Sequence, residues 1–222
     1  MAEKPILFST PMIQALLNTK PGVWPAEPID DSKPFKSQTR RAIKKKYIEI
    51  DGREVLLSGR PVYEPLGFMT VTGIKRPKYQ PGDLLWVRET FIPWDNIASD
   101  IQQYIDQNGK KAPFIFKADY TPGHAKGWKP SIHMPRIASR IILEVKSVRI
   151  EQVQKIKPED AVAEGAVKKP HYIRWGGEKC LAIHGRYKKD FEKLWDSIND
   201  KRGYSWEYNP WVWVYEFMRV KT

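Results

Sequence analysis

Hydrophobic and polar positions change period several times along the 222-residue chain, and each change predicts an element. Apolar residues at helical spacing follow Ser9, Thr10 and Pro11, which suit a helix start, and they recur from 187 to 199 on one face. Pro158 and Gly165 bound a shorter predicted helix, because proline fits a first helical turn and glycine a helix end. A further short helix is predicted at 97–106.

β-favouring runs separated by turn residues predict most of the remaining elements. Asp51-Gly52 forms the turn of a hairpin over 47–57, and the W-V-W-V run near the end predicts a strand buried on both faces near its start, with Trp211 and Trp213 in the core. The predicted strands lie at 5–8, 47–57, 68–74, 84–87, 113–120, 139–153 and 210–220.

Many strands and few helices favour an α+β fold, a mixed β-barrel flanked by a few helices, over a doubly wound sheet. Three segments rich in proline, glycine or irregular pattern, at about 20–35, 95–130 and 168–184, read as insertions in one domain over residues 1–222. The sequence does not indicate the oligomeric state.

Composition narrows the partners and the compartment. The formal charge of +12 and the pI near 9.6 favour a polyanionic partner such as RNA or single-stranded nucleic acid. Apolar runs fall far short of the roughly 20 residues of a membrane span, and the N-terminus lacks signal-peptide architecture, so no membrane partner is expected. A lone cysteine, Cys180, indicates a reducing, cytoplasmic location.

Cofactor and metal chemistry find little support in the motifs. The chain has no G-x-G-x-x-G or Walker motif, so we expect no nucleotide cofactor. Cys180 and His184 lie four residues apart without a second Cys/His pair, so we expect no metal site.

The stretch from Phe35 to Lys46 places six basic residues around Thr39. Such a run is commonly a solvated basic face, and it is also a candidate site for an anionic or RNA-like ligand. Lys36 and Thr39 are its candidate specific residues, and Arg40 and Arg41 are candidate ligand-binding residues.

Two other segments carry candidate binding residues. In W-V-R-E, alternation places Trp86 and Arg88 on one face, where Arg88 either pairs with a carboxylate or contacts a phosphate. The second segment mixes aromatic and basic groups, as single-stranded nucleic acid requires for stacking and charge, or holds a structural histidine. Its candidate residues are Trp128, Lys129, His133 and Arg136.

Four motifs in order resemble those of the ASCH superfamily, whose members have a PUA-like β-barrel. They are P-I-L-F-S-T-P-M with its helix, K-S-Q-T-R-R, Y-Q-P-G-D-L-L-W-V-R-E-T and E-D-A-V-A-E-G. The tail W-D-S-I-N-D-K-R-G-Y to N-P-W-V-W-V-Y-E-F is similar to that of larger ASCH-like proteins of bacteriophages and prophages, which would place the chain in a bacterial host cytoplasm.

The resemblance implies RNA or nucleoside binding in a cleft of the barrel. Some small family members are amidohydrolases that deacetylate acetylcytidine with a K-x-x-T motif and a glutamate, which correspond here to Lys36, Thr39 and Glu164. Family members run from the first helix directly into the motif, so Lys20 is an alternative for the family lysine.

In such a site, a lysine of lowered pKa would activate the Thr39 hydroxyl, and Glu164 would orient the lysine or protonate the leaving amine. Arg40 or a backbone amide would stabilise the oxyanion. The sequence leaves four functions open: this amidohydrolase, a ribonuclease, a non-catalytic nucleic-acid-binding module, and a phage accessory or assembly protein that binds another protein.

Overall fold

The structure is a computed structural model. It describes residues 3–30, 33–43, 47–50, 53–56, 71–72, 77–93, 114–119, 127–166, 172–175, 178–181 and 187–221. The helix predicted at 97–106 lies outside these residues. No helix among them has the length and apolar character needed to cross a membrane.

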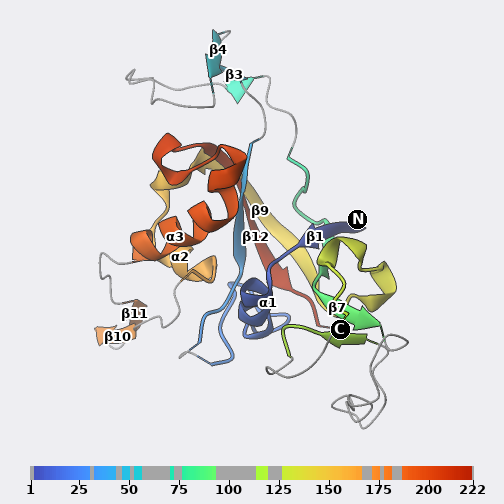
Figure 1. The fold of residues 1–222 in the computed structure, drawn as a ribbon. Helices are drawn as coiled ribbons and strands as arrows, with labels where there is room; N and C mark the ends of the chain where they lie inside the picture. Colours follow the sequence, from blue (N-terminus) through green and yellow to red (C-terminus); the bar gives the residue numbers. More distant parts are fainter. Residues whose placement is uncertain are drawn as a thin grey trace.

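A five-stranded mixed sheet forms the centre of the fold (Figure 1). Its strands lie in the order β1 (Glu3–Leu7), β6 (Leu84–Arg88), β9 (Ile142–Gln152), β12 (Trp211–Arg219) and β2 (Gln38–Ala42). β1 and β6 are parallel, whereas the other neighbours are antiparallel, and β12 has a register shift between Glu216 and Phe217.

Smaller elements surround this sheet. Of the hairpin predicted over 47–57, the two antiparallel strands are confirmed as β3 and β4, and its turn lies outside the described residues. The segment 168–184, which we expected to be irregular, contains the antiparallel pair β10 and β11. The short strands of these elements are β3 (Tyr47–Ile50), β4 (Arg53–Leu56), β5 (Val71–Thr72), β7 (Phe91–Pro93), β8 (Phe114–Phe116), β10 (Tyr172–Trp175) and β11 (Glu178–Leu181).

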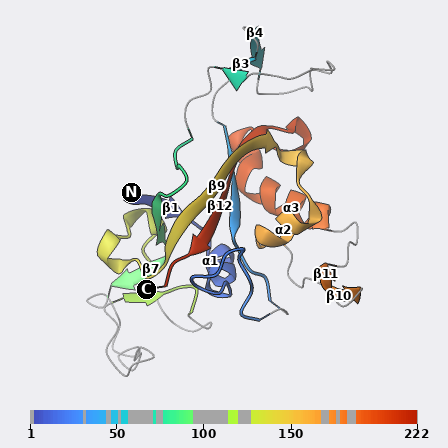
Figure 2. The ribbon, with the colours of Figure 1, turned by 180° about the vertical axis from the view of Figure 1, so that it is seen from behind.

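The three predicted helices outside 97–106 are confirmed as α1 (Thr10–Leu17), α2 (Pro158–Ala163) and α3 (Tyr187–Asn199). Short 3₁₀ helices lie at Ser131–His133, Arg136–Ala138, Val153–Lys155, Asp200–Arg202 and Trp206–Tyr208. Seen from the front and from behind, α2 and α3 lie together on one side of β2 and β12, with β1 and β7 on the other side (Figures 1 and 2).

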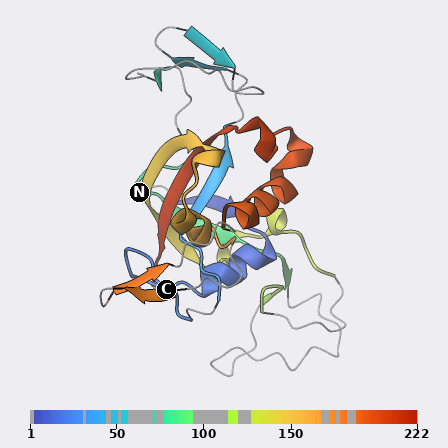
Figure 3. The same ribbon diagram turned by 90° about the vertical axis from the view of Figure 1, so that its left-hand side faces the viewer.

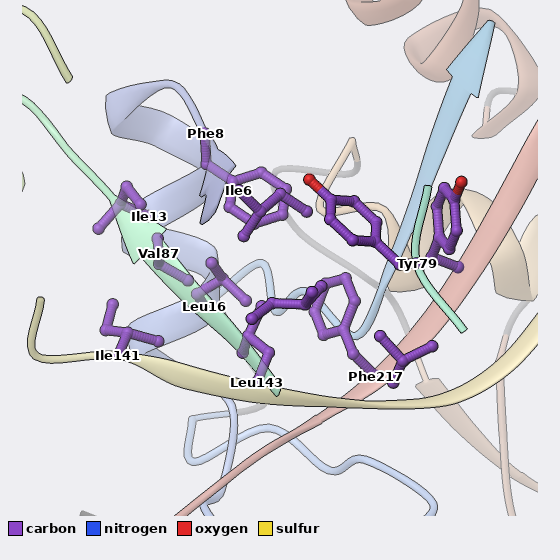
Figure 4. Packing of buried hydrophobic residues seen from close by; sticks show 12 residues of the cluster. Ile6, Phe8, Ile13, Leu16, Tyr79, Val87, Ile141, Leu143 and Phe217 are labelled. Carbon is purple, nitrogen blue, oxygen red and sulfur yellow. The ribbon is translucent and has the colours of Figure 1, made fainter. Parts of the chain in front are cut away.

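Two hydrophobic clusters bury the two faces of β12, as its sequence predicted. Phe217, together with Tyr215, belongs to the cluster in which apolar side chains of α1, β1, β6 and β9 converge (Figure 4). Val212 and Val214 pack instead against α2 and α3. Trp211 and Trp213 were predicted to lie in the core, but both are only half-buried; Trp213 packs against the edge of the first cluster, and Val212 and Val214 on the opposite face are fully buried.

The two edge strands of the sheet approach each other without pairing. β9 and β12 curve strongly (Figure 3), and the Arg41 side chain on β2 donates a hydrogen bond of 2.8 Å to the carbonyl of Leu7 on β1. We call this unpaired gap between β1 and β2 the seam. We expected a closed mixed barrel, but within the described chain the strand ladder stays open at the seam, so the fold is α+β with an open curved sheet. Open edges leave backbone groups and side chains free to meet a ligand.

Candidate functional site

The K-x-x-T motif lies where the segment 20–35 returns to the end of α1. The Lys36 amide donates to the carbonyl of Ala15 at 3.2 Å, and the Thr19 hydroxyl donates to the Lys36 carbonyl at 3.0 Å. Lys36 therefore follows the first helix directly in space although the segment 20–35 separates the two in sequence. Lys20 is partly exposed and pairs with Glu27, so it lies outside the site.

Glu164 reaches Lys36 from the end of α2. It is the C-terminal cap residue of that helix, and Gly165 after it adopts φ +73°, in the left-handed region that favours glycine. A Cβ on Gly165 would lie 3.1 Å from Cβ of Ala15 and 3.7 Å from Cβ of Lys36. The glycine thus allows α2 to end directly against α1 and the motif.

Lys36 is completely buried, contrary to the expectation of a solvated basic face. Its ammonium donates three hydrogen bonds: to the carbonyl of Gln38 at 2.7 Å, to the carbonyl of Glu164 at 2.8 Å and to Oε2 of Glu164 at 3.0 Å. Burial lowers the pKa of Lys36; Glu164 opposes this shift, and the charges of Arg41 and Arg40 add to it. Lys36 therefore loses its proton more readily than an ordinary lysine.

Arg40 fixes Glu164 from the other side. Its Nη1 donates to Oε1 of Glu164 at 3.0 Å, and its other nitrogens bind Glu151 and Asp160 at 2.9 Å. Burial favours a lower pKa for Arg40, but the three carboxylates outweigh it and raise the pKa. The Arg40 side chain is fully engaged by protein carboxylates, which makes it a support for Glu164 rather than a free ligand-binding group.

These contacts continue into an ion-pair network across the sheet. Arg149 on β9 bridges Glu216, Glu151 and Asp160. Three cations, Lys36, Arg40 and Arg149, thus meet four carboxylates. Because the network neutralises its own cations, its charges hold the motif in place and leave little positive charge for a ligand.

A cavity of ≈ 710 Å³ opens at the seam beside this network. Thr39 and Glu164 both contribute to its wall, together with residues of β1 and α3. The Thr39 hydroxyl makes no hydrogen bond to another group of the described chain, and the residue is almost fully buried, with 3% of its surface exposed. Lys36 lies behind the wall, and its ammonium contacts the peptide carbonyl that immediately precedes Thr39.

Arg41 and Arg88, both predicted to bind ligand, line the same cavity. Arg41 lies 5.4 Å from the ring centroid of Phe8 in addition to its bond to Leu7. Arg88 stacks 4.6 Å from the ring centroid of Trp86, which confirms that the two side chains share a face, and donates to the carbonyl of Ile132 at 3.1 Å. Arg88 has no carboxylate partner within the described segments; the adjacent Glu89 pairs with Arg140 instead.

The second predicted binding segment lies elsewhere. Lys129 and His133, both exposed, line another cavity of ≈ 580 Å³ with apolar residues of β7 and β8, and the two cavities share no lining residue. Arg136 is exposed and pairs with Glu3, and Trp128 is half-buried. The structure thus separates these four residues from the K-x-x-T motif.

The cavity wall also contains Lys78, Tyr79, Arg202 and Trp213, none of which the sequence analysis assigned to a binding site. Tyr79 precedes the Q-P-G-D turn and Arg202 follows α3, and neither was singled out for chemistry. The alternation of β12 suggested a buried strand, but only the register of Trp213 opposite Arg41 reveals that this ring reaches the cavity.

Metal binding receives no structural support within the described residues, where no three His, Cys, Asp or Glu side chains are grouped to hold an ion. Comparisons with protein-family models, curated proteins and solved structures found no match to this chain.

Proposed function

We propose that the chain is an ASCH-type, PUA-like protein that binds a modified nucleoside at the seam and hydrolyses an acyl-amide on its base. The observation that carries this proposal is the hydrogen bond between Lys36 and Glu164, 128 residues apart in sequence, at a cavity whose wall includes both Glu164 and Thr39. The resemblance to acetylcytidine amidohydrolases supplies the reaction class.

The proposed reaction combines the hydrogen bond between Lys36 and Glu164 with a proton transfer from Thr39 to Lys36 that ligand binding would bring about. Neutral Lys36 accepts the proton of Thr39 as Oγ1 attacks the acyl carbon; the proton passes through the Lys36–Glu164 hydrogen bond to the leaving amine. The C–N bond breaks, and an acyl-threonine ester remains. Water then hydrolyses this ester and restores the hydroxyl, so the products are a carboxylic acid and the amine of cytidine.

Hydrolysis of N4-acetylcytidine by the full chain tests the proposal. Thr39→Val removes the hydroxyl at nearly constant volume and should lower kcat by at least ~10³-fold, whereas Thr39→Ser should keep most of it. Thr90→Val is the matched control, since Thr90 lies outside the cavity wall. Equal turnover in the Thr39→Val variant and the unaltered protein would remove Thr39 from the mechanism.

One observation favours a second function, the non-catalytic binding of a nucleoside or of RNA. All three protons of the Lys36 ammonium already have acceptors, as in a purely structural ion pair. That function predicts ligand binding without turnover, and Thr39→Val would then change affinity alone.

A further inference from the structure

The cations around the cavity fall into two groups. Lys36 and Arg40 are neutralised by carboxylates within 3.0 Å. The second group, which we call the unpaired cations, consists of four wall residues that form no ion pair with any acid in the described part of the chain: Arg41, Lys78, Arg88 and Arg202. Proteins usually pair charges that are partly buried, because desolvation without a partner is unfavourable.

Two of the unpaired cations repel each other. Arg41 is half-buried and Arg202 is exposed at the rim. Burial lowers the pKa of Arg41; Tyr79 and Glu164 oppose this shift, and the charge of Arg202 reinforces it. An anion bound between the two guanidinium groups would relieve this repulsion.

Arg88 leaves a hydrogen-bond donor unused. Its Nε is buried and has no partner among the described residues, while its Nη1 donates to a carbonyl and its plane stacks on Trp86. These contacts fix the guanidinium in one orientation. A guanidinium held in this way at the wall of the cavity is suited to bind a phosphate oxygen.

We propose that Arg41, Arg88 and Arg202 form a phosphate subsite of this cavity, with Lys78 at the rim, so that the ligand is a phosphorylated nucleoside. The phosphate is either that of a mononucleotide or that of an RNA chain. This phosphate subsite rests on the proposed function, which supplies the nucleoside part of the ligand. The cavity volume suits a nucleotide, and the aromatic residues Tyr79 and Trp213 are part of its wall.

Equilibrium binding of three probes to the full chain tests the subsite without any requirement for turnover: cytidine, cytidine 5′-monophosphate and a cytidine hexaribonucleotide. We expect at least one phosphorylated probe to bind about tenfold or more tightly than cytidine. Arg202→Gln, at an exposed residue that can change without loss of the fold, should remove most of this advantage and leave cytidine binding unchanged. For the hexanucleotide, it should make the slope of log K against log salt shallower by about 0.7.

Arg136→Gln is the matched control. It removes the same charge from an exposed arginine outside the cavity, so the phosphorylated probes should keep their affinity. If the monophosphate binds more tightly than cytidine and Arg202→Gln removes this difference in affinity, the ligand is a mononucleotide. If only the hexanucleotide binds more tightly than cytidine, and Arg202→Gln removes that difference, the ligand is RNA. Equal affinity of all three probes, or equal losses in Arg202→Gln and Arg136→Gln, would overturn the subsite. Phosphate-dependent binding without amide hydrolysis would refute the proposed reaction and leave the subsite standing.

Discussion

Gly165→Ala tests whether the end of α2 must pack closely for Glu164 to meet Lys36. The substitution has two effects. An L-residue at φ +73° costs about 1–2 kcal/mol of backbone strain. The new methyl group would also lie 3.1 Å from the Ala15 methyl group, and overpacking of this kind costs a further ~1–3 kcal/mol.

Gly203→Ala separates the two effects. Gly203 has nearly the same backbone conformation, φ +79°, but nothing lies within 4 Å of the position its Cβ would take. This control should therefore lose only the strain, about 1–2 kcal/mol, whereas Gly165→Ala should lose about 2–5 kcal/mol in total.

Thermal and urea unfolding of both variants measure the difference. At about 2–4 °C per kcal/mol for a chain of this size, Gly165→Ala should have the lower Tm by roughly 2–12 °C relative to Gly203→Ala. Gly165→Ala should also reduce amide hydrolysis, because relief of the contact moves Glu164 away from Lys36. Equal Tm values for the two variants, or full activity in Gly165→Ala, would refute the reasoning that close packing at Gly165 sets the site.

Two further predictions concern Lys36. Lys36→Met should lower the free energy of unfolding, measured in urea, by about 3–5 kcal/mol, because it leaves buried acceptors without their donor. The control Lys20→Met removes a lysine from an exposed ion pair and should lower this free energy by less than ~1 kcal/mol. Similar losses in the two variants would contradict the buried ion pair. Because the folded chain lowers the pKa of Lys36 below the ordinary 10.5, the folded state binds fewer protons than the unfolded state between the two pKa values, so the free energy of unfolding should rise with pH in that window. Lys36→Met should flatten this rise, and an unchanged slope in urea titrations at pH values below the ordinary pKa of 10.5 would show that Lys36 keeps an ordinary pKa.

Local pattern predicted the helices α1, α2 and α3 and most of the strands, but it missed β2, β7 and the pair β10 and β11. Pro158 and Gly165 bound α2, and the alternation in the last strand of the chain predicted β12 with both faces buried. Closure of the sheet into a barrel could not be predicted from local pattern, because it depends on how far β9 and β12 curve and whether β1 meets β2 across the seam. No short-range pattern encodes that approach.

The candidate site also contains residues that the sequence identified and contacts that only the fold creates. Lys36 and Thr39 were found as a motif, and the resemblance pointed to Glu164. The role of Arg40 was not predictable, since its partners Glu151 and Asp160 come from β9 and α2, and only the fold places three carboxylates around one guanidinium. Charge counting along the sequence likewise could not separate the neutralised cations from the unpaired ones.

The most direct measurement is an experimentally determined structure of the Thr39→Val variant with N4-acetylcytidine 5′-monophosphate. Our account predicts the ligand in the cavity at the seam, with its acetyl carbon within about 3.5 Å of the substituted side chain at position 39 and its phosphate against Arg41 and Arg202. A ligand bound instead beside Lys129 and His133, or a cavity at the seam that stays empty at saturating ligand, would contradict it.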